Sequence, residues 1–259
     1  MGAPYETLLY AVGDDVATVT LNRPERRNPL GRESVNEILH ALRAARDEKA
    51  VRVIVMTGAG KAFSAGGDLG QMQGTGESKI PHQGDYADLL AEMTRLGKPT
   101  IARINGHAMG GGFGLAVSCD LAIASTEAKL GTPEVDVGLF PMMIMAVLRR
   151  NVLRKRLVEM MLTGERIGAE EAAHLGFINR AVAPATLDAA VKDLCDKLKA
   201  KSPVTLRLGL EAFHAQDKMT LDEALPYLRD MLGKCLATDD AREGLMAFVE
   251  KRQPKWTGR

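Results

Sequence analysis

The sequence NGHAMGGGFG, residues 105–114, carries five glycines and lies between two apolar runs. The run before it, residues 99–104, is short and partly β-branched, which predicts a strand, and the run after it, residues 113–119, predicts an apolar helix. A glycine in a helical turn is less favourable than alanine by about 1 kcal/mol, so the glycines are a costly way to begin a helix. Either a negatively charged ligand oxygen approaches the free N–H groups of the first turn, or the helix packs closely on the sheet.

A second glycine-bearing turn, AFSAGGDL at residues 62–69, follows a strand predicted for residues 51–56. Between them, TGAG at residues 57–60 looks like the opening of a nucleotide-binding turn. The third glycine of a dinucleotide fingerprint is replaced by Phe63, however, and the lysine-serine or lysine-threonine pair of a P-loop is absent. We therefore interpret the two glycine-bearing turns together, and not as a nucleotide site.

Length and composition describe a globular protein with enough apolar side chains for a core: 259 residues, of which 46% are hydrophobic. The 34 basic and 33 acidic residues nearly cancel, so the charge balance favours neither nucleic acid nor an anionic membrane as a partner. The three cysteines are far apart and lack a CxxC spacing, which argues against disulfides and zinc. Membrane-spanning and signal-peptide patterns are absent from the sequence, so we expect a cytoplasmic protein.

Strands and helices alternate in the first two-thirds of the chain, whereas the last third is almost wholly helical. A hairpin is predicted at residues 8–21, where Gly13-Asp-Asp15 supplies the turn. Further strands are expected at residues 120–124 and 177–182, and helices at residues 35–45, 86–96, 154–163, 169–175, 187–200, 203–215, 221–236 and 239–250. This order predicts α/β units closed by a helical layer.

A proline-glutamate step at residues 133–134 places a carboxylate in apolar company. Glu134 is either an acid favoured by the positive end of a helix dipole or a reacting group. The methionine-rich residues 139–148 that follow suit a core or an irregular pocket wall. Residues 71–85 predict a mobile surface loop over a pocket.

Hydrolase triads and metal sites find no support in the motifs. Ser64 and Ser118 lie outside a GxSxG sequence, the histidines have no motif partners, and HExxH is absent. What remains is two backbone turns and one carboxylate. This combination suits a reaction in which two N–H donors hold a carbonyl oxygen as it becomes an enolate, while a carboxylate moves a proton on carbon.

Four segments are LNRPERRNPL at 21–30, AFSAGGDL at 62–69, INGHAMGGGFGLAVSCDLAIA at 104–124 and LTGERIGAEEAAHLGFINRAV at 162–182. In this order they resemble the enoyl-CoA hydratase/isomerase (crotonase) family. The similarity runs from about Tyr5 to Trp256. The resemblance implies an α/β fold, a crotonase-like spiral of ββα units with an acyl-CoA site in residues 1–200. It implies a helical C-terminal region, residues 201–259, that assembles homotrimers, often paired into hexamers. Coenzyme A would be part of the acyl-CoA substrate, with no separate cofactor and no metal.

The same resemblance assigns roles to individual residues. It implies that Ala65 and Gly111 supply the two oxyanion-hole N–H groups and that Glu134 moves the proton. It implies CoA contacts for Arg27, Gly66, Gly67 and Asp68, and contacts to a neighbouring subunit's CoA for Phe248 and Lys251.

Gly114 departs from the pattern of the family's hydratases, which carry a glutamate there in addition to the one that matches Glu134. Because Gly111 and Gly114 are three residues apart on one helical face, we expect Gly114 to look into the same pocket and to leave space for water or a bulkier acyl group. A single glutamate resembles the enoyl-CoA isomerases, in which one carboxylate carries a proton between two carbons. The alternatives are a single-glutamate enoyl-CoA hydratase, a CoA-thioester decarboxylase or thioesterase, and a catalytically idle acyl-CoA-binding subunit.

Overall fold

A six-stranded sheet forms the centre of the computed structural model, which describes residues 5–68 and 79–259. Its strands, in spatial order, are β1 (Leu8–Gly13), β2 (Val16–Leu21), β4 (Val53–Gly58), β7 (Thr100–Ile104), β9 (Leu121–Ser125) and β12 (Arg180–Val182). β1 and β2 form an antiparallel hairpin at one edge, and each later pair is parallel. The predicted hairpin is confirmed: Gly13 pairs with Val16, and the turn residues Asp14 and Asp15 both have positive φ.

Two smaller sheets carry the glycine-bearing turns. The four-stranded sheet has the order β11-β10-β8-β5, with β5 (Ala62–Ser64), β8 (His107–Met109), β10 (Lys129–Gly131) and β11 (Arg166–Gly168). The two-stranded sheet pairs β3 (Pro29–Leu30) with β6 (Gly66–Gly67). Because β5, β8 and β10 run parallel, the segments that follow them all leave the sheet at the carboxyl ends of the strands, on the same side of the sheet.

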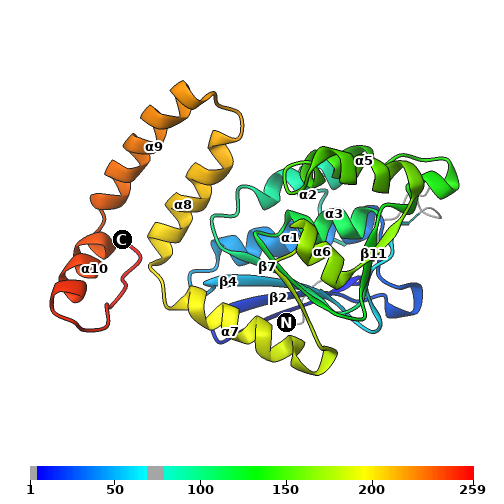
Figure 1. Ribbon diagram of the computed structural model, residues 1–259. Helices are drawn as coiled ribbons and strands as arrows, with labels where there is room; N and C mark the ends of the chain where they lie inside the picture. Colours follow the sequence, from blue (N-terminus) through cyan, green and yellow to red (C-terminus); the bar gives the residue numbers. More distant parts are fainter. Residues whose placement is uncertain (1–4, 69–78) are drawn as a thin grey trace.

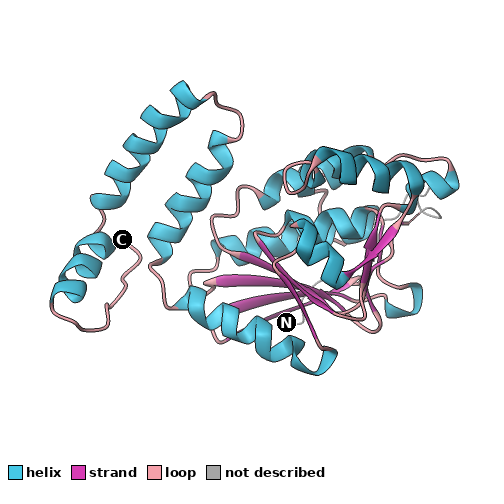
Figure 2. Cartoon of the chain, in the orientation of Figure 1, coloured by secondary structure: helices cyan, strands magenta, loops and turns pink. Residues whose placement is uncertain are grey.

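Helices lie on both sides of the large sheet, as Figure 1 and Figure 2 show. They are α1 (Arg32–Asp47), α2 (Tyr86–Met93), α3 (Gly111–Ser118), α4 (Met142–Leu148), α5 (Arg154–Thr163), α6 (Ala169–Leu175) and α7 (Leu187–Lys199). Alternate residues of β4 face opposite sides: Ile54 and Met56 join the main core with α1 and α3, whereas Val53 and Val55 pack with Val191 of α7. Burial on both faces explains the unbroken apolar sequence of this strand.

The last three helices extend away from the α/β body (Figure 1). They are α8 (Pro203–Gln216), α9 (Leu221–Leu236) and α10 (Asp239–Val249). The chain end returns toward the body, where the indole N–H of Trp256 donates to the carbonyl of Ala200 at 2.8 Å. The extension leaves several large apolar side chains exposed: Phe213, Leu221, Leu225, Leu232, Leu236, Leu245, Met246, Phe248 and Val249. Within one chain, this apolar surface is uncovered.

The sequence prediction missed the short strands of the two smaller sheets, and it differs from the structure at the ends of other elements. The glycine-rich helix begins at Gly111, two residues before the predicted start, and the strand predicted for 177–182 is confined to Arg180–Val182. The methionine-rich segment forms α4, in which Ile144 and Leu148 are buried and Met142 is exposed, so it contributes to the core along one face. Of the predicted loop at 71–85, residues 71–78 lie outside the described residues.

Candidate active site

The two glycine-bearing turns and Glu134 follow three neighbouring parallel strands of the four-stranded sheet. Ala108 of β8 lies opposite Ser64 of β5 on one side and opposite Leu130 of β10 on the other. The chain leaves β5 into the first turn, β8 into the start of α3, and β10 into the 3₁₀ helix η2 (Pro133–Val137), which carries Glu134. Ligands of open α/β sheets bind outside the carboxyl ends of the strands. The fold therefore gathers three distant sequence segments at an edge suited to binding.

The glycines of residues 105–114 serve different purposes. Close packing applies at Gly112, where an added Cβ would lie 2.5 Å from the Cβ of Ser64. Gly110 has φ 49°, a backbone conformation that L side chains rarely adopt, and a Cβ there would lie 2.7 Å from Oε1 of Glu134. At Gly111 an added Cβ would have no neighbour closer than 3.6 Å. Close packing is therefore confirmed at Gly112, whereas the approach of a ligand oxygen to this turn stays a prediction.

The first turn of α3 presents a free N–H group. α3 begins at Gly111, so the N–H of this residue has no acceptor within the helix. The N–H of Gly110 donates to the carbonyl of Gly131 at 2.9 Å, whereas the described part of the chain offers no acceptor to Gly111. A Cβ on Gly66 would lie 3.4 Å from the nitrogen of Gly111, which places the turn after β5 beside this donor. The arrangement suits a partly negative oxygen at the positive end of the helix.

The N–H of Ala65 is not available as the second donor, which contradicts the prediction. It donates to the carbonyl of Arg27 at 2.8 Å. Gly67 is better placed, because β6 pairs with β3 so that the carbonyl of Leu30 accepts the N–H of Asp68 at 3.0 Å. In a parallel ladder, the N–H groups of successive residues point to alternate sides of the strand. Because the N–H of Asp68 points toward β3, the N–H of Gly67 points away from β3. An added Cβ on Gly67 would meet no atom of residues 5–68 and 79–259 within 4 Å.

The carboxylate of Glu134 is buried at one oxygen and directed at Gly110. Its Oε2 is shielded from solvent and has no hydrogen-bond partner among the described residues. Burial raises the pKa of Glu134 above its ordinary value, and this effect outweighs the opposing hydrogen bond from the backbone N–H of Glu134 itself. An acid that only favoured a helix start would have both of its oxygens solvated or bonded to the N–H groups of that turn. The unpaired, buried oxygen instead favours a proton-transfer group.

Tyr86 is a residue of the site that sequence reasoning missed. It is the first residue of α2, and its hydroxyl donates to the carbonyl of Gly111. Burial raises the pKa of Tyr86 far above its ordinary value, and the negative charge of Glu134 raises it further. No motif marks this tyrosine, because its place in the site depends on how α2 packs against α3.

The space expected beside Gly114 is already filled. An added Cβ on Gly114 would lie 2.3 Å from Cγ2 of Ile144 and 2.9 Å from the hydroxyl oxygen of Tyr86. The prediction that this glycine leaves room for water or for a bulkier acyl group is therefore wrong. Gly114 instead allows α2 and α4 to pack against α3.

The other predicted contact residues fall into two groups. Asp68 is buried and pairs with Arg26 at 2.9 Å, and Arg27 is exposed with φ 60°, so both lie close to the turn after β5. Phe248, on α10, is 84% exposed, and Lys251 lies just beyond that helix. Figure 1 shows α10 far from α3, so these two residues do not join the site of their own chain.

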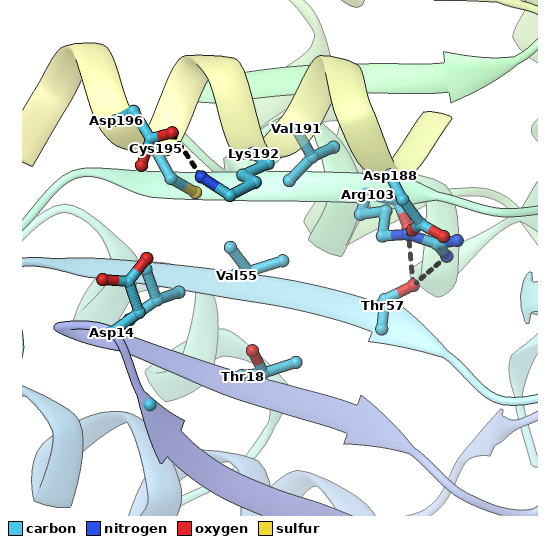
Figure 3. A pocket seen from close by; sticks show the side chains of 12 residues that line it. Asp14, Thr18, Val55, Thr57, Arg103, Asp188, Val191, Lys192, Cys195 and Asp196 are labelled. Atoms are coloured by element: carbon cyan, nitrogen blue, oxygen red, sulfur yellow. Dashed lines mark hydrogen bonds and ion pairs between the residues drawn. The ribbon is translucent and has the colours of Figure 1, made fainter. Parts of the chain in front are cut away.

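A separate groove of about 370 Å³ lies between α7 and the outer face of the large sheet (Figure 3). Its charged groups form ion pairs: Arg103 with Asp188 and Lys192 with Asp196, both at 2.6 Å, and Asp14 with Lys199 outside the lining at 2.7 Å. The groove is lined by none of the residues that form the site described above. Paired charges and the absence of an unsatisfied group among its described lining residues make it a weaker candidate for chemistry.

Metal and membrane features are not found in the described residues. Within residues 5–68 and 79–259, histidine, cysteine, aspartate and glutamate side chains do not gather in groups of three or more suited to a metal ion. The helices described here are too short or too polar to cross a membrane.

Comparison with known proteins gives a consistent result along the chain. A model of the family "Enoyl-CoA hydratase/isomerase" matches residues 12–259. The crotonyl-CoA hydratase of Syntrophomonas wolfei is 33% identical over 252 residues, covering 96% of this chain and 97% of that protein. The short-chain-enoyl-CoA hydratase of Clostridium acetobutylicum is 32% identical over 241 residues, covering 92% of each. The crystal structure of an enoyl-CoA hydratase from Mycobacterium smegmatis superposes with a TM-score of 0.90 at 32% identity, covering 97% of this chain and 99% of that one. The chain has the crotonase-like fold and belongs to the enoyl-CoA hydratase/isomerase family.

Proposed function

We propose that the protein moves a double bond in an enoyl-CoA thioester through an enolate, with Glu134 as the single proton carrier. The thioester oxygen binds between the N–H groups of Gly111 and Gly67. The observation that carries the proposal is the buried Oε2 of Glu134, which has no hydrogen-bond partner among the described residues and lies beside the turn that presents the N–H of Gly111. A preorganised donor of this kind contributes about 100- to 1,000-fold in rate.

The proton and electron steps balance with one carboxylate. Glu134 removes a proton from C2 of a 3-enoyl thioester, and the electron pair of that C–H bond delocalises onto the thioester oxygen, where the two N–H groups stabilise the negative charge. The protonated Glu134 then returns the proton to C4 while the double bond forms between C2 and C3. The product is the 2-enoyl thioester, and the carboxylate is regenerated.

Hydration of a 2-enoyl-CoA is the second candidate, because two similar proteins are named crotonyl-CoA hydratase and short-chain-enoyl-CoA hydratase. Hydration needs a water molecule held and activated as well as a proton delivered to carbon. The space at Gly114, where a second acid would stand, is occupied by Ile144 and Tyr86. This packing favours the one-carboxylate reaction.

A substrate panel decides between the two candidates. We expect a 3-enoyl-CoA to be converted faster than crotonyl-CoA of equal chain length, with hydration about 100- to 10,000-fold below that of a two-glutamate hydratase assayed in parallel. Incorporation of ¹⁸O from labelled water, followed by mass spectrometry, measures hydration, and release of the 2-enoyl product measures isomerisation. Rapid ¹⁸O incorporation with an untouched 3-enoyl thioester would establish the hydratase instead.

We also propose that the protein is a homotrimer or hexamer, in which Phe248 and Lys251 approach the CoA of a neighbouring subunit. The exposed apolar residues of α8 to α10 support this, because a single chain leaves them in water. Light scattering at micromolar concentration should give three or six times the mass of one chain, 27.9 kDa. A monomer under these conditions would contradict both the proposed assembly and the proposed roles of Phe248 and Lys251.

A further inference from the structure

Tyr86 reaches α3 from a helix end that is itself firmly fixed. Asp85 caps α2: its carboxylate accepts the N–H groups of Ala87 and Asp88 at 2.8 and 3.0 Å, and the carboxylate of Asp88 accepts the N–H of Asp85 at 2.8 Å. This reciprocal capping box holds the backbone at Tyr86, the first residue of the helix. From there the phenol extends to the first turn of α3, where its hydroxyl donates to the carbonyl of Gly111.

The phenol lies across two glycines of α3. An added Cβ on Gly111 would lie 3.6 Å from both Cζ and the hydroxyl oxygen of Tyr86, and one on Gly114 would lie 2.9 Å from that oxygen. A side chain at either position would therefore compete with the tyrosine for the same space. The absence of side chains at Gly111 and Gly114 lets the hydroxyl reach the helix backbone.

The turn that Tyr86 contacts needs an external restraint. Glycine has more conformational freedom than any other residue, and the first turn of α3 contains Gly111, Gly112 and Gly114. An N–H group stabilises a developing negative charge well only when it is already held in place. Two side-chain hydroxyls of the described residues donate to this turn: that of Ser118, from the same helix, to the carbonyl of Gly114 at 2.7 Å, and that of Tyr86, from another helix, to the carbonyl of Gly111.

The hydroxyl proton of Tyr86 stays on the tyrosine. Burial and the nearby charge of Glu134 both raise the pKa of Tyr86, so the hydroxyl remains neutral, and its proton is directed at the carbonyl of Gly111. The group therefore differs from a second carboxylate, because it accepts no proton from water or substrate.

We propose that Tyr86 is a positioning residue, which holds the first turn of α3 so that the N–H of Gly111 stays fixed relative to Glu134. This inference rests on the proposed function for its effect on rate. It goes beyond that function in assigning the rigidity of the oxyanion-binding turn to a residue of another helix.

Tyr86→Phe tests the proposal, because it removes the hydroxyl and keeps the ring. We expect kcat on the preferred enoyl-CoA to fall about tenfold, while KM stays within about a factor of two. The acid limb of the pH profile of kcat should not move, because Tyr86 transfers no proton. A variant with wild-type kcat would overturn the proposal, and so would a variant that loses or gains a limb of the pH profile.

Hydrogen exchange provides a second readout that does not depend on activity. In Tyr86→Phe, backbone amides in peptides covering residues 110–118 should exchange faster than in the wild type, whereas peptides from α8 should be unaffected. Unchanged exchange in residues 110–118 would overturn the proposal even if no substrate were turned over. Tyr5→Phe is the matched control: it removes a hydroxyl that contacts Nδ1 of His40 at 2.9 Å, and kcat and exchange in α3 should remain as in the wild type.

The two proposals fail in different ways. A wild-type protein without activity on any enoyl-CoA, or a Glu134→Gln variant as active as the wild type, would contradict the proposed function while the exchange measurement still tests Tyr86. A wild-type protein that is active and depends on Glu134, but is indifferent to Tyr86→Phe in both readouts, would contradict only the positioning role.

Discussion

Glu134→Gln lowers kcat on the preferred enoyl-CoA by about 100-fold or more and leaves the affinity for the CoA thioester nearly unchanged. The amide keeps the shape of the side chain but does not carry the proton between carbons. Steady-state kinetics and calorimetric binding of a non-reactive acyl-CoA measure the two effects separately. The matched control is Glu127→Gln, at an exposed glutamate outside the site, which should behave as the wild type. Retained activity in Glu134→Gln would return this residue to the role of a helix-start acid.

The pH dependence of Glu134 follows from its burial. Because the pKa is raised above 4.5, the carboxylate needed for proton abstraction is lost at a higher pH than for an ordinary glutamate, so the acid limb of kcat/KM lies above pH 4.5. The raised folded-state pKa contributes stability that is fully present below the unfolded-state value and is lost as the pH rises through the folded-state value. Near neutral pH, Glu134→Gln should therefore have a higher Tm than the wild type, and the difference should vanish near about pH 4.

Gly110→Ala reduces both stability and turnover. The backbone at this position has φ 49°, and forcing an alanine into it costs on the order of 1–3 kcal/mol. The new Cβ would also lie 2.7 Å from Oε1 of Glu134. The carboxylate is the movable partner in this clash, so it is displaced from the site. A misplacement of about 1 Å costs about 100-fold in rate, which is the fall that we expect in kcat.

Gly209→Ala controls for the substitution itself. Gly209 lies inside α8, and an added Cβ would have no neighbour within 4 Å among the described residues, so the variant should be as active as the wild type and more stable by up to about 1 kcal/mol. Denaturant unfolding and steady-state kinetics compare the two variants. A fully active Gly110→Ala protein would show that Glu134 tolerates displacement and would weaken its assigned role.

The sequence was sufficient for those parts of the site that depend on local pattern. The glycine-rich turn, the turn after β5 and the glutamate after Pro133 are each marked by residue type, and the parallel pairing of β5, β8 and β10 brings them together. The choice between Ala65 and Gly67 was beyond such reasoning. Gly66 has φ 93°, which interrupts the strand alternation and determines which N–H groups bond to the β3 segment.

Tertiary packing decided what the sequence left open. The space beside Gly114 depends on Ile144 and Tyr86, which come from helices on either side of α3 in the sequence. No periodicity or spacing relates these residues to one another. A missing side chain in a sequence therefore does not indicate a cavity, because a neighbouring element is free to fill it.

The parallel strands β5, β8 and β10 set the spacing of the groups that take part in the proposed reaction. Neighbouring strands of a sheet are about 4.8 Å apart, so the spacing between the two oxyanion-binding turns and the glutamate-bearing helix η2 is set by backbone hydrogen bonds and not by side chains. Under the proposed mechanism, acyl chains of different length, anchored by the same thioester oxygen, would present the same carbons to Glu134. The sheet would then determine which bond moves, and residues elsewhere would determine the preferred chain length.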